Sequence, residues 1–319
     1  RREDRIEGAL FCRGLWQDRS TSTGERAGIA SHTRSRHNID IPVKVFTATM
    51  ELLNLGDLGS PKVITGYAVG CRNFAAVDSG PSSVSGEYAT RALRALDGSL
   101  KYVLITHAHI DHSGGLAKFL TEAPEVRAEA YVKAYRHLVD PSRLAEASRR
   151  SLGPLYTWWG DPEPVPAERV DALEDGAEVD LGGCSAKLIA TPGHASHSSV
   201  WMVDDTLFAG DSAGMRTDDG IWPAAPPGFK MDEFMSSLRK LRSLSPRRVC
   251  FAHFGCAEGP HILDDAIDAH LKANEVLRSV CPAPGETVLR ELSRALGIKL
   301  PQGLEPNHYW YHYYLTIVV

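Results

Sequence analysis

Three histidines and an aspartate lie within six consecutive positions of this 319-residue chain, at His107, His109, Asp111 and His112. Imidazole nitrogen and carboxylate oxygen are ligands that zinc, iron and manganese share. Burying four such side chains together costs free energy unless a cation compensates. The cluster directly follows Tyr102–Ile105, a short apolar run typical of a buried strand. We therefore expect it to form half of a metal site at the end of a strand.

Three further candidate ligands also lie shortly after predicted strands. His194, Asp211 and His253 each come shortly after a predicted strand, so all can project to one edge of a sheet sandwich. His197 is expected to be a supporting residue beside the metal or an ordinary polar neighbour, and not a ligand. The remaining isolated histidines have no candidate ligand nearby and are predicted to be surface or satisfied interior residues: His32, His137, His261 and His270.

The elements that must position these residues fall into two strand-rich halves. Strands are predicted at Val43–Phe46, Val63–Val69, Asn73–Gly80, Tyr102–Ile105, Glu129–Val132, Glu178–Leu181, Ala186–Ala190, Val200–Val203, Thr206–Ala209 and Arg248–Ala252. Helices are predicted at Glu87–Leu96, after Ser113, and at Tyr135–Val139, Arg143–Ser151, Met231–Leu244, His261–Val280 and Glu286–Leu296. Gly56-Asp57 is predicted to be a turn between strands. The pattern favours an α/β fold in which two sheets pack together with helices outside.

Three segments are expected along the chain. Residues 1–40 are predicted to be a mobile N-terminal tail, residues 41–280 the domain that carries the candidate ligands, and residues 281–319 a helical and aromatic extension. The aromatic run at 309–314 is expected to dock on the core or on a second subunit, which would make a homodimer. Trp158 and Trp159 lie in a Pro-rich loop that is either a lid over a pocket or ordinary packing.

The amino-acid composition limits the classes of partner that we expect the chain to bind. The chain is 43% apolar and 24% charged with a net charge of −5, which is typical of a soluble globular protein and gives no basic excess for nucleic acid. No apolar run approaches the length of a membrane span, so no membrane partner is expected. The six cysteines form no C-x-x-C pair, which argues against a disulfide framework or a thiolate zinc site and favours a cytoplasmic location.

The ordered set of ligands resembles the metallo-β-lactamase superfamily. The resemblance rests on His107-x-His109-x-Asp111-His112, Pro192-Gly193-His194, Gly210-Asp211 and a late His253, and it covers residues 43 to 255. It implies an αβ/βα four-layer sandwich with a dinuclear metal site at one edge. It also implies that His107, His109 and His194 hold the first metal, that Asp111, His112 and His253 hold the second, and that Asp211 bridges them. Zinc is the expected metal, with iron and manganese as alternatives.

Branches of this superfamily carry different residues at some ligand positions, and these can be compared with the residues of this chain. The β-lactamases with a mixed site carry Cys where this chain has Asp211, and flavodiiron proteins carry Glu where it has His109. The exosite and basic surface of the tRNA-processing nucleases are not evident here. What remains is similar to glyoxalase II, the acyl-homoserine lactonases and related esterase-like hydrolases. The basic residues with which glyoxalase II holds glutathione are not identifiable here.

The resemblance implies a metal-dependent hydrolase acting on a small molecule. A hydroxide shared by two cations attacks an ester, lactone or thioester carbonyl, and Asp111 orients the nucleophile and relays a proton. Trp158, Trp159 and Phe229, with the Pro223–Phe229 loop, are expected to bind the substrate. Alternatives are phosphodiester hydrolysis at the same site, a mononuclear-iron persulfide dioxygenase, and a non-catalytic metal-binding scaffold, the last disfavoured by the complete ligand set.

Overall fold

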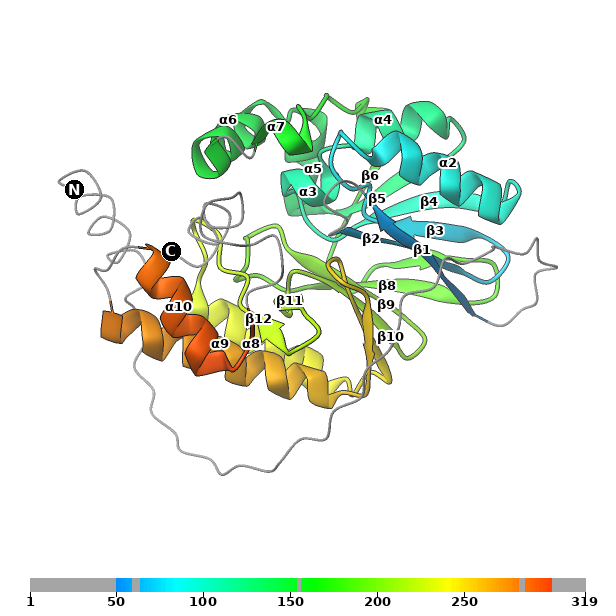
Figure 1. Cartoon of the computed structure of the whole chain (residues 1–319). Helices are drawn as coiled ribbons and strands as arrows, with labels where there is room; N and C mark the ends of the chain where they lie inside the picture. The colour runs from blue at the N-terminus through cyan, green and yellow to red at the C-terminus, as the bar shows by residue number, and fades with distance from the viewer. Residues whose placement is uncertain (1–49, 59–63, 154–155, 281–284, 300–319) are drawn as a thin grey trace.

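The computed structural model describes residues 50–58, 64–153, 156–280 and 285–299. Two six-stranded sheets pack face to face, and helices cover the outer face of each (Figure 1). The predicted four-layer αβ/βα sandwich is therefore confirmed. The expected N-terminal tail, the Val43–Phe46 strand and the aromatic run at 309–314 lie outside the described residues.

The first sheet has the strand order β1-β2-β3-β4-β5-β6. Its strands are β1 (Glu51–Leu58), β2 (Ile64–Gly70), β3 (Phe74–Val77), β4 (Leu100–Ile105), β5 (Arg127–Tyr131) and β6 (Val170–Leu173). The helices of this half are α2 (Ser85–Leu96), α3 (Ile110–Ser113), α4 (Leu116–Glu122), α5 (Val132–Val139), α6 (Ser142–Leu152) and α7 (Tyr156–Trp159), with a 3-10 turn η2 (Ala167–Arg169). Strands β3 to β6 are parallel, so their carboxyl ends meet at one edge.

The second sheet has the order β14-β13-β10-β9-β8-β7. Its strands are β7 (Glu178–Asp180), β8 (Ser185–Ala190), β9 (Ser199–Val203), β10 (Thr206–Gly210), β13 (Arg248–Phe251) and β14 (Cys256–Glu258). A two-stranded sheet, β11 (Met215–Arg216) and β12 (Ile221–Trp222), lies beside it, and the helices are α8 (Met231–Ser243), α9 (His261–Val280) and α10 (Gly285–Leu296). Strands β10 and β13 are parallel and also end together.

Alternating side chains of the central strands explain the layers. In β4, Val103 and Ile105 pack beneath the helices of the first half, whereas Leu104 points between the sheets. In β10, Leu207 packs towards the second helical layer and Phe208 towards the other sheet. Because both faces of these strands are buried, they appear in the sequence as continuous apolar runs rather than alternating ones.

The prediction that the cysteines do not form disulfides is wrong. Disulfides join Cys71 to Cys184 and Cys250 to Cys256, the first linking residues 113 positions apart. Spacing along the chain carries no information about partners that the fold brings together from different strands. The cysteines therefore no longer support the expected reducing, cytoplasmic location. No helix within the described residues is long and apolar enough to cross a membrane.

Two local predictions are also corrected. Gly56-Asp57 lies inside β1 and not in a turn, because a bulge after Asn54 absorbs the extra residue. The φ of Gly56 is +86°, and its N–H donates to Asn54 Oδ1 at 2.8 Å, which stabilises that bulge. Trp158 and Trp159 lie on the short helix α7 rather than in a loop.

Candidate metal centre

All seven predicted ligands come from the ends of strands at one edge of the sandwich. His107 follows β4, and the chain then turns into α3, for which His109 is the N-cap residue. Asp111 and His112 lie on that single helical turn. From the second half, the remaining three ligands follow β8, β10 and β13: His194, Asp211 and His253. The structure brings the seven side chains together as two groups, each able to hold a metal ion.

Three imidazole nitrogens form the first group. His107 Nε2 and His194 Nε2 lie 2.9 Å and 3.0 Å from His109 Nδ1. Nitrogens bound at about 2.0–2.1 Å to a tetrahedral zinc ion lie roughly 3.3–3.4 Å apart. The observed spacing is close to this value, so the group fits a cation bound by three nitrogens.

Contacts on the far side of the rings orient these ligands. His194 Nδ1 donates to the backbone oxygen of Ala224 at 2.9 Å, which leaves the Nε2 lone pair facing the group. His107 Nδ1 lies 3.1 Å from the Thr106 hydroxyl. Burial, followed by repulsion from neighbouring imidazoles, holds the pKa of His107 and of His109 well below the usual value. The rings are therefore neutral and have lone pairs to donate.

Two carboxylates and two imidazoles form the second group. His112 Nε2 lies 3.5 Å from Asp111 Oδ2 and 3.4 Å from Asp211 Oδ1. His253 Nε2 lies 3.7 Å and 3.6 Å from the same two oxygens. The other oxygen of Asp211, Oδ2, faces the first group at 3.6 Å from His194 Nε2. Asp211 thus lies between the groups with one oxygen towards each.

The buried charge of the second group fits a cation. Burial alone would lower the pKa of His112, but the Asp111 and Asp211 carboxylates outweigh it and raise that pKa well above its usual value. Burial would raise the pKa of Asp211, but His112, His253 and His194 lower it below its usual range. His112 Nε2 and Asp211 Oδ1 are buried without a hydrogen-bond partner among the described residues. A divalent cation would satisfy both atoms.

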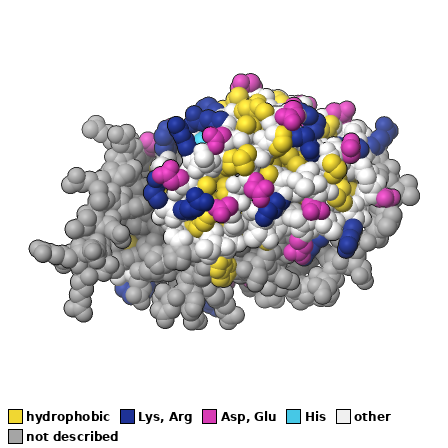
Figure 2. All heavy atoms as spheres, turned by 90° about the horizontal axis from the view of Figure 1, so that it is seen from above, with side chains coloured by type: hydrophobic (Ala, Val, Ile, Leu, Met, Phe, Trp, Pro, Cys, Tyr) yellow, Lys and Arg dark blue, Asp and Glu magenta, His cyan; other side chains and the backbone are white. Residues whose placement is uncertain are grey.

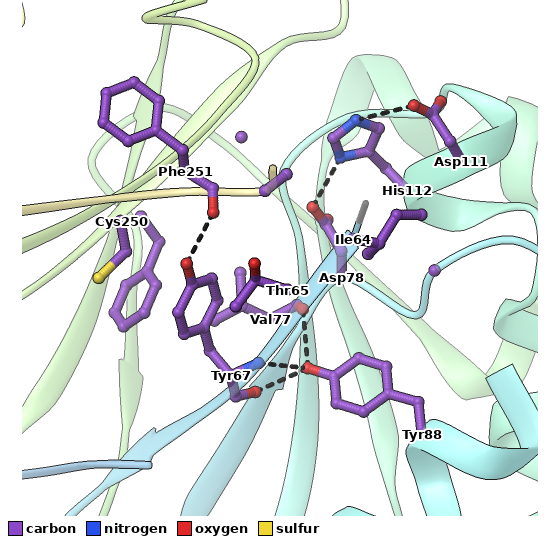
Figure 3. Close-up of a pocket in the computed structure, with 14 residues that line it drawn as sticks. Ile64, Thr65, Tyr67, Val77, Asp78, Tyr88, Asp111, His112, Cys250 and Phe251 are labelled. Atoms are coloured by element: carbon purple, nitrogen blue, oxygen red, sulfur yellow. Dashed lines mark hydrogen bonds and ion pairs between the residues drawn. The ribbon is translucent and has the colours of Figure 1, made fainter. Parts of the chain in front are cut away.

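A residue that the sequence analysis did not single out holds this group in place. Asp78 follows β3 and is buried, and its carboxylate accepts from His112 Nδ1 at 2.9 Å. The same carboxylate accepts from the Thr106 backbone N–H at 2.7 Å and from the Thr106 hydroxyl at 2.8 Å. Figure 3 shows Asp78 and Asp111 on opposite sides of the His112 ring. Asp78 thereby directs His112 Nε2 at the metal group, and the signal available in the sequence was a carboxylate near the end of an otherwise apolar predicted strand.

Two glycines allow the ligand loops to approach their neighbours. Gly193 has a φ of +130°, and a Cβ there would lie 2.2 Å from the backbone nitrogen of Phe234 in α8. Gly210 has a φ of +50°, and a Cβ there would lie 2.6 Å from the Thr106 hydroxyl. Any larger residue at either position would push His194 or Asp211 away from the other ligands.

A pocket of about 260 Å³ opens onto both groups. His109, Asp111, His194 and Asp211 lie at its base, and α6 and the Pro226-Pro227 segment form its walls. The Pro223–Phe229 loop, which was expected to bind the substrate, therefore contributes to the pocket. His197, expected beside the metal or as an ordinary polar neighbour, also lines it, as do His137 and Arg143, which the sequence analysis did not assign to the site.

The three aromatic residues predicted to bind substrate do not line this pocket. Trp158 is 39% exposed on α7, and Trp159 packs against the hydrophobic core of the first half. Phe229 is buried against Phe234 and His270, with ring centroids 4.9 Å and 6.3 Å away. The prediction followed from their aromatic character, whereas the packing of α8 and α9 turns Phe229 inward.

Comparison with known proteins agrees with this geometry. Residues 77–253 match the model of the metallo-beta-lactamase superfamily. The chain is 33% identical over 225 residues to the metallo-beta-lactamase fold-containing protein ST1585 of Sulfurisphaera tokodaii, covering 69% of this chain and 84% of that protein. The crystal structure of ST1585 superposes with a TM-score of 0.61 over 70% of this chain and 86% of that one, at 31% identity.

A relative with a named substrate covers less of the chain. The hydroxyacylglutathione hydrolase of Vibrio cholerae (strain ATCC 39541) is 31% identical over 177 residues, which is 54% of this chain and 53% of that enzyme. The alignment thus spans about half of that relative. The fold, the match over residues 77–253 and the paired ligand groups lead to one conclusion. The chain belongs to the metallo-beta-lactamase superfamily.

Proposed function

We propose that the protein is a hydrolase that cleaves an ester, lactone or thioester at a dinuclear metal centre, with zinc as the metal. The observation that carries this proposal is the position of Asp211, which directs one oxygen to each ligand group. Two divalent cations held there would lower the pKa of a bound water and polarise the carbonyl of the substrate. The name of the Vibrio cholerae relative, whose substrate is a thioester, supports this class of bond.

The first ligand group and Asp111 have different roles in the proposed reaction. The first group, His107, His109 and His194, consists of three neutral imidazoles, of which His109 and His194 line the base of the pocket. Asp111 both belongs to the second group and lines the pocket, so its carboxylate reaches the side on which substrate enters. That placement suits its carboxylate to orient the attacking water and to accept its proton.

A panel of substrates tests the proposal. Zinc-reconstituted protein is assayed on matched carboxylic esters, lactones and thioesters, with chelator-treated protein as the control. Metal-dependent turnover of at least one class is expected, with two zinc ions per chain by mass spectrometry of metals. No metal-dependent turnover of any class would refute the proposal.

Two outcomes of the same panel would replace it with another reaction. Faster cleavage of bis-p-nitrophenyl phosphate than of any carboxylic ester, by orders of magnitude, would indicate a phosphodiesterase. One iron per chain with oxygen consumption on a persulfide would indicate a dioxygenase, for which the second ligand group would have no role.

A further inference from the structure

The wall of the pocket opposite the metal ligands is one face of α6. Leu144, Ala147, Ser148, Ser151 and Leu152 line the pocket from this helix. Their spacing of three and four residues places them on a single helical face. The wall is therefore mostly apolar with two hydroxyl groups, and it suits a short carbon chain. At about 260 Å³ the pocket is smaller than the ~300–1,000 Å³ of sites for drug-sized ligands.

Beside the metal centre, His197 presents a hydrogen-bond donor of fixed identity. Its Nδ1 lies 3.2 Å from the backbone nitrogen of Ala108, and that N–H can only donate. Nδ1 must therefore accept, so the ring proton is on Nε2. The ring lines the pocket, with its centroid 5.5 Å from that of the ligand His109. His197 thus offers an N–H to a ligand oxygen without carrying a charge.

At the outer end of the pocket lies a cationic side chain, that of Arg143. Arg143 is exposed and lines the pocket, and no hydrogen bond or ion pair to its guanidinium is found within the described residues. Two other arginines of α6 differ from it, because Arg149 pairs with Asp161 and Arg150 with Glu146. Burial, and then Arg136 and Arg143, lower the pKa of His137, whose ring lies 5.1 Å from that of His197.

The carboxylates near this end do not line the pocket. Asp140 is exposed and accepts from the Ser142 backbone N–H at 3.2 Å. The only carboxylates among the described residues that line the pocket are the metal ligands Asp111 and Asp211 at its base. Figure 2 shows Lys and Arg side chains interspersed with Asp and Glu around a visible His side chain on the face that the helices of the first half cover. Within the pocket lining, hydrogen-bond donors thus run from His197 beside the metal centre to Arg143 at the rim.

We propose that the substrate is a compact molecule carrying a carboxylate on the part that points away from the reacting bond, and that Arg143 binds this carboxylate. His197 Nε2–H donates to a neutral oxygen nearer the metal centre, and the α6 face packs on the chain between them. The assignment rests on the proposed function for the position of the reacting bond. It makes Arg143 the residue that selects anionic over neutral substrates.

Matched thioesters that differ only in charge test this selection. The first pair is 3-(acetylthio)propanoate and S-propyl thioacetate, with the carboxylate on the thiol side. The second is S-propyl monothioglutarate and S-propyl thiopentanoate, with the carboxylate on the acyl side. Arg143→Gln is expected to raise KM about tenfold for the anionic member of at least one pair and to leave the neutral member unchanged. Arg149→Gln, on the same helix but outside the pocket, is the control and should change neither. Equal changes for both members of each pair, or no change in any KM, would overturn the assignment.

A binding measurement separates this inference from the proposed reaction. Zinc-loaded protein is titrated with 3-mercaptopropionate and with propanethiol in a calorimeter. The wild type and Arg149→Gln should prefer the acid about tenfold, and Arg143→Gln should lose the preference. This preference without metal-dependent turnover of any ester, lactone or thioester would refute the proposed function and keep the carboxylate site. Turnover without this preference would refute the carboxylate site and keep the proposed function.

Discussion

The two ligand groups lie side by side but differ in charge and in how they are held. The first is built from neutral imidazoles, one of which is oriented by a backbone oxygen of Ala224. The second contains two carboxylates and is oriented by a third, Asp78. The first group can form with little electrostatic cost, whereas the second gathers negative charge that a proton or a cation must balance. The metal-free protein should therefore respond differently at each group.

The largest effect is expected where the groups meet. Asp211→Ala removes the side chain that contacts both, so zinc content should fall at both groups and turnover by at least about 1000-fold. Metal analysis and a thioester assay measure the change. Asp205→Ala, at an exposed hairpin where Asp205 pairs with Arg247, is the control. Full zinc occupancy in Asp211→Ala would show that the groups are independent.

Asp78→Asn should affect mainly the second group, because Asp78 contacts His112 directly and reaches His107 only through the Thr106 hydroxyl. The substitution weakens the hydrogen bond that fixes the His112 ring, and loss of such a contact typically costs about 10–100-fold in metal affinity. Competition with a chromophoric zinc chelator should show one affinity reduced and the other preserved. Equal weakening of both affinities would mean that Asp78 supports the whole edge of the sheet and not one ligand.

Proton release should distinguish the groups directly. In the metal-free protein the pKa of His112 is raised, so its proton stabilises the fold at low pH, and this stabilisation is lost as pH rises through the raised pKa. The pKa values of His107 and His109 are lowered, so both are already neutral at pH 7.5. Zinc binding to His194→Ala, which retains the second group, should release about one more proton than binding to His253→Ala, which retains the first. Calorimetry in buffers of different ionisation enthalpy counts these protons, and equal counts would contradict the assigned charges.

The smallest effect is expected from His270→Gln. His270 is buried in α9, and its Nε2 accepts from the Ala224 N–H at 3.3 Å, while the oxygen of Ala224 accepts from His194. Loosening Ala224 should weaken the first group by tenfold or less and leave the second unchanged. Competition with a chromophoric zinc chelator measures the zinc affinities of the two groups separately. A weakened second group would indicate general loss of packing around α9.

The meeting of the seven candidate ligands could be predicted from the sequence, because each lies shortly after an apolar strand and carries a metal-binding side chain. The helices and strands that were predicted within the described residues lie close to observed ones for a similar reason, since buried strands and amphipathic helices leave clear periodic patterns, whereas β1, β6 and β14 were not predicted. Glu178–Leu181 and His261–Val280 are examples, the second matching α9 in full.

Contacts between distant segments could not be predicted in the same way. The face of α6 that lines the pocket is defined only by how α6 packs over the sheet edge, and its residues are ordinary for a surface helix. Phe229 and Trp159 are aromatic but pack inward. Likewise, nothing in the spacing of Cys71 and Cys184 indicates that they meet.

The disulfide between Cys250 and Cys256 encloses the turn that carries His253. By the chain-entropy relation a loop this short contributes about 2 kcal/mol to stability, against about 5 kcal/mol for the loop closed by Cys71 and Cys184. Its main effect is local, because it ties β13 to β14 on either side of one ligand of the second group. Reduction of this disulfide is therefore expected to loosen the turn that carries His253, so the affinity of the second group for a metal ion should fall under reducing conditions.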